Sequence, residues 1–128
     1  MKKVFLAGTS NGSKWRNELI ELLKIDFFNP LDINSLENKD EINKQKEVCD
    51  YILYVITPKM TGYLNIAEAV DFSNKYPRKT IFCSLPTDGH DVFSKFEIKS
   101  LNAVGKLIMK NGSQWFKDME KLAHYLNQ

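Results

Sequence analysis

The sequence predicts a single α/β domain, residues 1–128, with a parallel sheet of four or five strands between two layers of helices. Two observations carry this prediction: short continuous apolar runs alternate with segments of helical periodicity, and no repeat, low-complexity tract or linker interrupts the chain. A continuous apolar run is typical of a strand that is buried on both faces. The expected architecture is therefore a flavodoxin-like or Rossmann-like three-layer sandwich.

The first half of the chain supplies two strands and two helices. Val4–Ala7 is an apolar run that the polar loop Gly8–Ser13 ends, so a buried strand is expected there. Ser13 can cap the next helix, whose apolar positions follow helical spacing: Trp15, Leu19, Leu22 and Leu23. Ile25–Phe28 is the second expected strand. A polar stretch then leads to a helix from about Asp40 to Val48.

The second half continues the alternation. Tyr51–Ile56 is the most apolar strand candidate, and a helix that begins at Thr61 or Gly62 is expected to run to about Lys75. Thr80–Cys83 is the fourth strand, followed by a loop with turn residues. The remaining expected elements are a long helix with Phe93, Phe96, Leu101, Val104 and Ile108 on its apolar face, a weak strand at Gln114–Phe116, and a helix at Lys117–Leu126.

Composition and charge exclude several classes of function. The 18 basic and 16 acidic residues nearly balance, so the chain lacks the strong positive charge expected for binding a nucleic acid polymer. No apolar run reaches the roughly 18 residues of a membrane span, and Val4–Ala7 is too short for a signal peptide. Cys49 and Cys83 lie beside or within apolar runs, as small buried thiols do in a reducing compartment. A cytoplasmic protein is expected.

Four loops should share the functional edge of the sheet. In open parallel sheets, ligands bind outside the carboxyl ends of the strands, at the point where the strand order reverses. The loops that follow the first four strands meet this condition: Gly8–Ser13, Pro30–Asp40, Thr57–Leu64 and Ser84–His90.

Glu68 is the main candidate for chemistry. On its expected helix, Ile66, Val70 and Ser73, flanked by Ala67 and Ala69, form the face toward the sheet; Leu64, Glu68 and Phe72 lie roughly opposite. A carboxylate in an apolar stripe can be a nucleophile toward a sugar carbon or a general base. Alternatively, it is an exposed glutamate with two exposed apolar neighbours. The second apolar stripe also predicts a homodimer or higher homo-oligomer.

Further candidates lie in the edge loops. Gly8, Thr9, Ser10 and Asn11 offer backbone N–H groups, hydroxyls and an amide to an anion or a sugar, although a tight strand-to-helix turn explains the same residues. The carboxylates that could pair with Glu68 for acid–base chemistry are Asp32, Asp40 and Glu41; the last two also suit the first turn of a helix. Asn34, Thr57 and Gly62 complete the substrate-binding candidates. No metal-ligand spacing occurs, and neither a metal nor a cofactor is expected.

An ordered set of segments within residues 3 to 84 resembles the nucleoside 2-deoxyribosyltransferases and their shorter relatives, which include nucleotide N-glycosidases. The set comprises Val4–Gly8, Asn29–Asp32, Cys49–Val55 and Gly62–Ala69. The resemblance implies a flavodoxin-like domain in which a glutamate attacks the anomeric carbon of a (deoxy)nucleoside or nucleotide. Glu68 matches that glutamate, and Asn34 lies near the position of a base-contacting amide.

Two of the departures from the family pattern bear directly on the chemistry of Glu68. The first-strand tyrosine that helps to hold the nucleophile falls on Phe5, so no hydroxyl is expected from that position. The acid that protonates the leaving base has no counterpart between Thr57 and Ile66. The resemblance therefore implies N-glycosidic cleavage or transfer, and the alternatives are a non-catalytic nucleotide-binding module and an interaction protein that uses Leu64 and Phe72.

Overall fold

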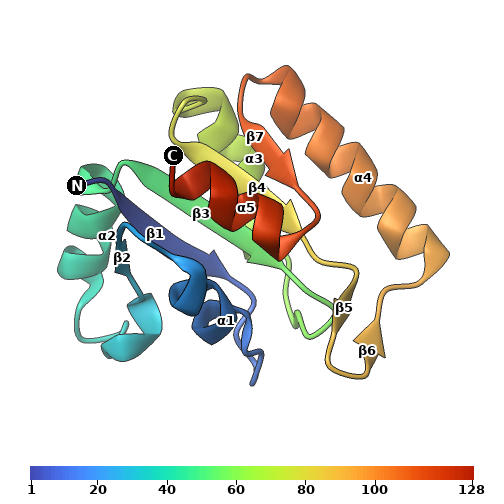
Figure 1. Cartoon of the computed structure of the whole chain (residues 1–128), viewed down its shortest axis with the longest axis horizontal. Helices are drawn as coiled ribbons and strands as arrows, with labels where there is room; N and C mark the ends of the chain where they lie inside the picture. Colours follow the sequence, from blue (N-terminus) through green and yellow to red (C-terminus); the bar gives the residue numbers. More distant parts are fainter.

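The computed structural model describes residues 1–128 and contains one five-stranded, all-parallel sheet in the order β2-β1-β3-β4-β7 (Figure 1). The strands are β1 (Lys3–Gly8), β2 (Asp26–Phe28), β3 (Tyr51–Ile56), β4 (Thr80–Ser84) and β7 (Gln114–Phe116). The parallel sheet and its weak fifth strand confirm the predicted fold class.

Helices cover both faces of the sheet and make the three-layer sandwich (Figure 1). α1 (Trp15–Leu22) and α5 (Met119–Leu126) pack together on one face, where they share a core with Leu53 and Val55. The helices of the other face are α2 (Lys39–Val48), α3 (Leu64–Lys75) and α4 (Lys95–Lys110). A short 3-10 turn, η1 (Pro30–Asp32), follows β2.

The two-residue period of the strands divides the core. Along β1, Val4 and Leu6 face the α1/α5 layer, whereas Phe5 and Ala7 face the layer of α2, α3 and α4. In the parallel register Phe5 lies beside Ile52 and Ala7 beside Tyr54. The Tyr54 side chain therefore lies on the face of the sheet that α3 covers.

The sheet order reverses between β1 and β3, which makes their carboxyl ends the switch point. Two hydrogen bonds join the loop after β1 to the end of β3. The Thr9 N–H donates to the Val55 carbonyl at 2.9 Å, and the Thr57 N–H donates to the Thr9 hydroxyl at 3.0 Å. The predicted functional edge is thus a closely bonded junction of two loops.

The expected cap of α1 is wrong. Lys14 occupies the N-cap without a side-chain hydrogen bond, and the Ser13 hydroxyl instead donates to Asp88 at 2.5 Å. Asp88 belongs to a two-stranded antiparallel hairpin, β5 (Thr87–Asp88) and β6 (Asp91–Val92), that occupies the expected turn region. Ser13 therefore helps to hold the hairpin rather than to start the helix.

Several positions on the expected helices differ from their assignments. The Glu68 helix begins at Leu64, so Gly62 lies in the preceding loop. Ala67 is exposed rather than part of the face toward the sheet. Phe96 is 85% exposed in the first turn of α4 and does not belong to its apolar face. Phe93 lies outside this helix, because the capping box of Ser94 and Glu97 starts α4 at Lys95.

The second apolar stripe of α3 is explained largely within the chain. Phe72 lies edge-on to Tyr54 of β3 at 6.1 Å between ring centroids, and Glu68 accepts a hydrogen bond from the same Tyr54. These two positions of the stripe therefore face the sheet, and the prediction that they lie opposite it is wrong. Leu64 alone of the stripe is strongly exposed, at 71%. A homodimer or higher homo-oligomer stays a prediction.

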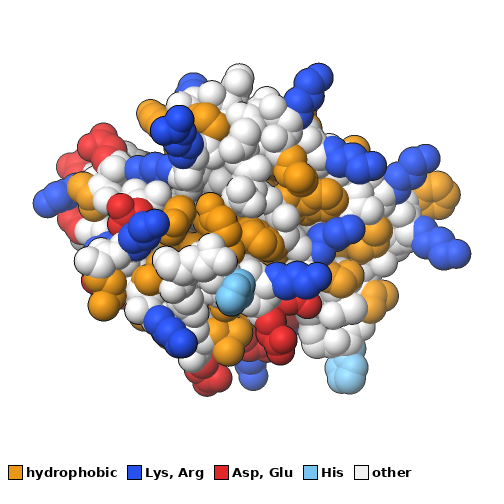
Figure 2. Space-filling model, turned by 45° about the horizontal axis from the view of Figure 1, so that its top comes forward, with side chains coloured by type: hydrophobic (Ala, Val, Ile, Leu, Met, Phe, Trp, Pro, Cys, Tyr) orange, Lys and Arg blue, Asp and Glu red, His pale blue; other side chains and the backbone are white.

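The visible surface does not form one large apolar face. Figure 2 shows hydrophobic side chains in several separate groups, with lysine and arginine side chains between them. No helix has both the length and the apolar character that crossing a bilayer requires. The cytoplasmic location stays a prediction.

Candidate functional site

The Glu68 carboxylate lies in the second turn of α3 and faces α2 and β3. Its Oε1 atom accepts a hydrogen bond from the Tyr54 hydroxyl and one from the Lys46 ammonium, each at 3.1 Å. The Glu68 side chain is 26% exposed and that of Lys46 is 24% exposed. Glu68 is therefore neither the freely exposed glutamate of the alternative interpretation nor a fully buried acid.

Tyr54 of β3 is the residue whose hydroxyl bonds Glu68. It is fully buried at the level of Glu68, on the strand next to β1. Burial, followed by the negative charge of Glu68 and the hydrogen bond to it, raises the pKa of Tyr54 well above its usual value. Tyr54 thus remains a hydrogen-bond donor across the physiological range.

Tyr54 was not among the residues proposed from sequence, because the family pattern places its tyrosine on the first strand. The alternation of Ile52, Tyr54 and Ile56 along β3 could have revealed it. All three side chains lie on the face that α3 covers, and Tyr54 is the one polar group among them.

Replacing Tyr54 with phenylalanine should change the alkaline stability of the protein. A folded-state pKa above the unfolded value of 10 gives stability that is fully present below pH 10 and is lost as the pH rises. Each pH unit above 10 then lowers the free energy of unfolding by about 1.4 kcal/mol through the Tyr54 hydroxyl. Urea unfolding at pH 7 and pH 11 should show a smaller alkaline loss for Tyr54→Phe than for wild type.

The same substitution should cost about 1 kcal/mol at pH 7, because Glu68 loses a hydrogen bond. Tyr63→Phe is the matched control, since Tyr63 is exposed and makes no side-chain hydrogen bond. If Tyr54→Phe and wild type lost the same free energy of unfolding between pH 7 and pH 11, the raised pKa of Tyr54 would be contradicted.

Lys46 brings a positive charge to Glu68 from α2. Its ammonium lies 5.6 Å from the centre of the Phe5 ring and 5.9 Å from that of Phe72, so two aromatic faces also contact the cation. Ile42, one turn earlier on α2, points to the same side. This side of α2, rather than its acidic first turn, faces Glu68.

A small pocket of about 200 Å³ opens beside Glu68. It lies between the carboxyl end of β1, η1 and the facing sides of α2 and α3. Its lining residues are Phe5, Ala7, Gly8, Ser10, Arg16, Pro30, Leu31, Ile42, Lys46, Asn65 and Glu68. We call it the Glu68 pocket; Glu68 is its only carboxylate.

Arg16 adds a second cation to the Glu68 pocket. This nearly fully buried guanidinium donates to the carbonyls of Leu6, Gly8 and Thr9 at 3.2, 3.2 and 2.7 Å. Burial lowers the pKa of Arg16 to about 10, so it stays charged at neutral pH. No carboxylate pairs with it, and the lining therefore carries two cations and one anion.

Comparisons of the chain with protein-family models, curated proteins and solved structures each found no match. Of the residues proposed from sequence, Gly8, Ser10 and Glu68 are brought together in the Glu68 pocket.

The other acids proposed from sequence lie elsewhere. Asp40 and Glu41 are exposed in the first turn of α2 and do not line the pocket; Glu41 accepts a hydrogen bond from Gln45 at 2.8 Å. Asp32 is exposed at the end of η1, although its neighbours Pro30 and Leu31 are lining residues. The roles assigned to these acids stay predictions.

The remaining polar candidates make bonds within the loops. Asn34 accepts from the N–H groups of Leu36 and Glu37, as an exposed turn residue does. The Asn11 amide donates to the Lys59 carbonyl at 3.1 Å. Thr9 is buried in the junction of the two loops, and Gly62 is exposed ahead of α3.

Asp88 ties the hairpin to this edge of the sheet. Its Oδ2 atom accepts from the hydroxyls of Ser13 and Thr57, at 2.5 and 2.6 Å. Lys59 forms a second link, an ion pair with Asp91 at 2.8 Å. Thr57 is therefore a fully buried structural contact, which holds the hairpin beside the Gly8–Ser13 loop.

Proposed function

We propose that this protein cleaves or transfers at the N-glycosidic bond of a (deoxy)nucleoside or nucleotide, with Glu68 as the nucleophile. The observation that carries the proposal is the single carboxylate of the pocket, held on one oxygen by Tyr54 and Lys46. Two donors on Oε1 fix the orientation of the carboxylate and leave Oε2 without a bonded partner. A fixed, partly desolvated carboxylate suits attack on an electrophilic sugar carbon.

The chemistry balances without a cofactor. A Glu68 oxygen forms a bond to the anomeric carbon as the carbon–nitrogen bond breaks, and the base leaves with the electron pair and takes up a proton. Water or a second base then attacks the glycosyl ester, which restores the carboxylate. Because Glu68 is the only carboxylate of the pocket, the proton for the base comes from water or from an acid outside the lining.

The charge of the pocket favours a phosphorylated substrate. Lys46 and Arg16 outnumber Glu68, and the Ser10 hydroxyl lies at the same edge. An arginine guanidinium and a hydroxyl are common partners of phosphate oxygens. This lining therefore suits a nucleotide better than an uncharged nucleoside.

A product screen tests the function. Wild-type protein is incubated with deoxyribo- and ribonucleosides and their 5′-monophosphates, and free base is measured by chromatography. Mass spectrometry of the quenched protein should show a glycosyl adduct on the peptide that contains Glu68. Absence of base release over the whole panel would contradict catalysis.

The second candidate is a nucleotide-binding module with no turnover. The absence of a second carboxylate among the lining residues favours it. Saturable binding of a nucleotide by calorimetry, with no product after hours, would select this function over the enzyme.

A further inference from the structure

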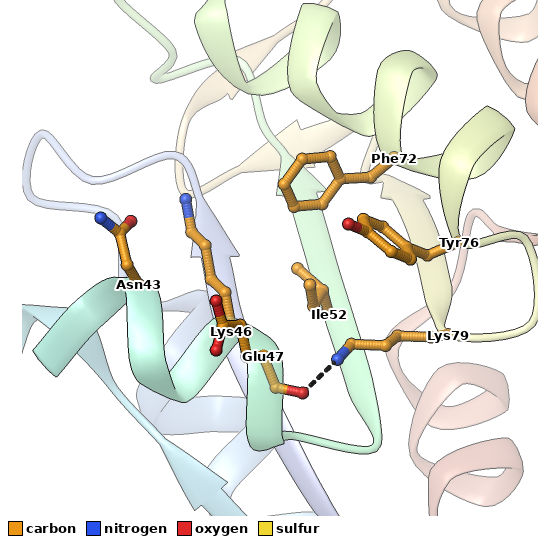
Figure 3. A pocket seen from close by; sticks show the side chains of 7 residues that line it. All are labelled: Asn43, Lys46, Glu47, Ile52, Phe72, Tyr76 and Lys79. Atoms are coloured by element: carbon orange, nitrogen blue, oxygen red, sulfur yellow. Dashed lines mark hydrogen bonds between the residues drawn. The ribbon is translucent and has the colours of Figure 1, made fainter. Parts of the chain in front are cut away.

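A second, larger cleft lies between α2 and α3 (Figure 3). Its volume is about 420 Å³, compared with about 200 Å³ for the Glu68 pocket. Seven residues line it: Asn43, Lys46, Glu47, Ile52, Phe72, Tyr76 and Lys79. We call it the α2–α3 cleft. Only Lys46 lines both cavities, so they meet at this side chain.

The α2–α3 cleft has an aromatic wall and an apolar floor. Phe72 and Tyr76 lie one turn apart near the end of α3, with ring centroids 5.6 Å apart and planes at 85° (Figure 3). Buried Ile52 forms the floor. An edge-to-face pair beside an apolar floor offers a flat ligand ring both stacking and edge contacts.

The α2–α3 cleft also carries a net positive charge. Lys46 reaches in from α2, and Lys79 reaches in from the segment before β4 (Figure 3). The Lys79 ammonium donates to the backbone carbonyl of Glu47 at 2.8 Å and has no carboxylate partner. Against these two cations stands one acid of the lining, the exposed Glu47.

We propose that the α2–α3 cleft is a second ligand site, which binds a flat aromatic ring carrying a negatively charged group. The ring packs against Phe72 and Tyr76, and the anionic group lies between Lys46 and Lys79. Because Lys46 is also the ion-pair partner of Glu68, an anion in the cleft competes with Glu68 for the same ammonium. This site goes beyond the proposed function, and its occupancy does not depend on turnover.

Two probes of the same shape and different charge test the site. 2-Naphthoate and neutral 2-naphthamide are titrated into the ¹⁵N-labelled protein and followed by NMR. We expect naphthoate to shift the amide signals of Ile52, Phe72, Tyr76 and Lys79, and to bind at least about threefold more tightly than naphthamide, as one partly exposed charge contact allows.

Variants separate the cleft from the Glu68 pocket. Tyr76→Ala and Lys79→Met should each weaken naphthoate binding at least about threefold, whereas Lys75→Met should not, because Lys75 pairs with Asp71 and does not line the cleft. Glu68→Gln should tighten binding about threefold, since it releases Lys46 from its carboxylate.

Shifts confined to Gly8, Ser10 and Leu31, equal binding of the two probes, or unchanged affinity in Lys79→Met would overturn the proposal. These binding experiments use no substrate. Their outcome therefore does not affect the proposal that Glu68 is a nucleophile, which the product screen tests separately.

Discussion

Glu68→Gln should lower the rate of base release by more than about a thousandfold. Glutamine has nearly the shape of glutamate, but its amide cannot form the glycosyl ester, and it removes the negative charge that stabilises oxocarbenium character in the transition state. The measurement is the rate of free-base formation from whichever substrate the product screen identifies.

Asp71→Asn is the matched control for this substitution. Asp71 lies three residues later on α3 and pairs only with exposed Lys75, at 2.9 Å. Its loss should change the free energy of unfolding by about 0.5 kcal/mol and leave the rate unchanged. A Glu68→Gln variant that folds and retains the wild-type rate would remove Glu68 from the mechanism.

The sequence predicted the layers of the fold because each strand is short, apolar and bounded by polar turns. Parallel strands such as β3 and β4 are buried on both faces, so their apolar runs stand out without an alternating pattern. The hairpin β5–β6 was not predicted, because each of its strands has only two residues and the sequence around Gly89 indicates only a turn. Its position depends on Asp88, whose partners are distant in sequence.

The candidate site was predicted only in part, for a physical reason. Loop position can place Gly8, Ser10 and Glu68 at one edge, since that follows from strand direction. It cannot say which side of α2 turns inward. The acids of its first turn are exposed, and Lys46, in the second turn, contacts Glu68.

The burial of Arg16 also could not be predicted from the sequence. In the sequence it is one of many basic residues, and its burial follows only from the way β1 ends. Three carbonyls at that end accept its N–H groups, so the guanidinium is satisfied without an acid. A buried cation with neutral partners is a feature of the folded chain, and it supports the proposal that the Glu68 pocket takes an anionic substrate.

Gly8→Ala should destabilise the protein by more than about 4 kcal/mol. Gly8 has a φ of +131°, which side-chain-bearing residues rarely adopt, and a Cβ atom there would lie 2.1 Å from the carbonyl oxygen of Val55. That oxygen belongs to the backbone of β3 and accepts the Thr9 N–H, so it cannot move away without breaking the junction of the two loops. Thermal unfolding followed by circular dichroism measures the effect.

Two other glycines separate crowding from backbone strain. Gly12 has a φ of +77° and open space around its Cβ position, so Gly12→Ala should cost only about 1 kcal/mol. Gly62 has neither a positive φ nor a close neighbour, and Gly62→Ala should stay within about 0.5 kcal/mol of wild type. Equal losses at Gly8 and Gly12 would show that the close approach of β1 to β3 contributes nothing. The expected order, with Gly8 far ahead, assigns the main cost to the contact that aligns the carboxyl ends of these two strands beside the Glu68 pocket.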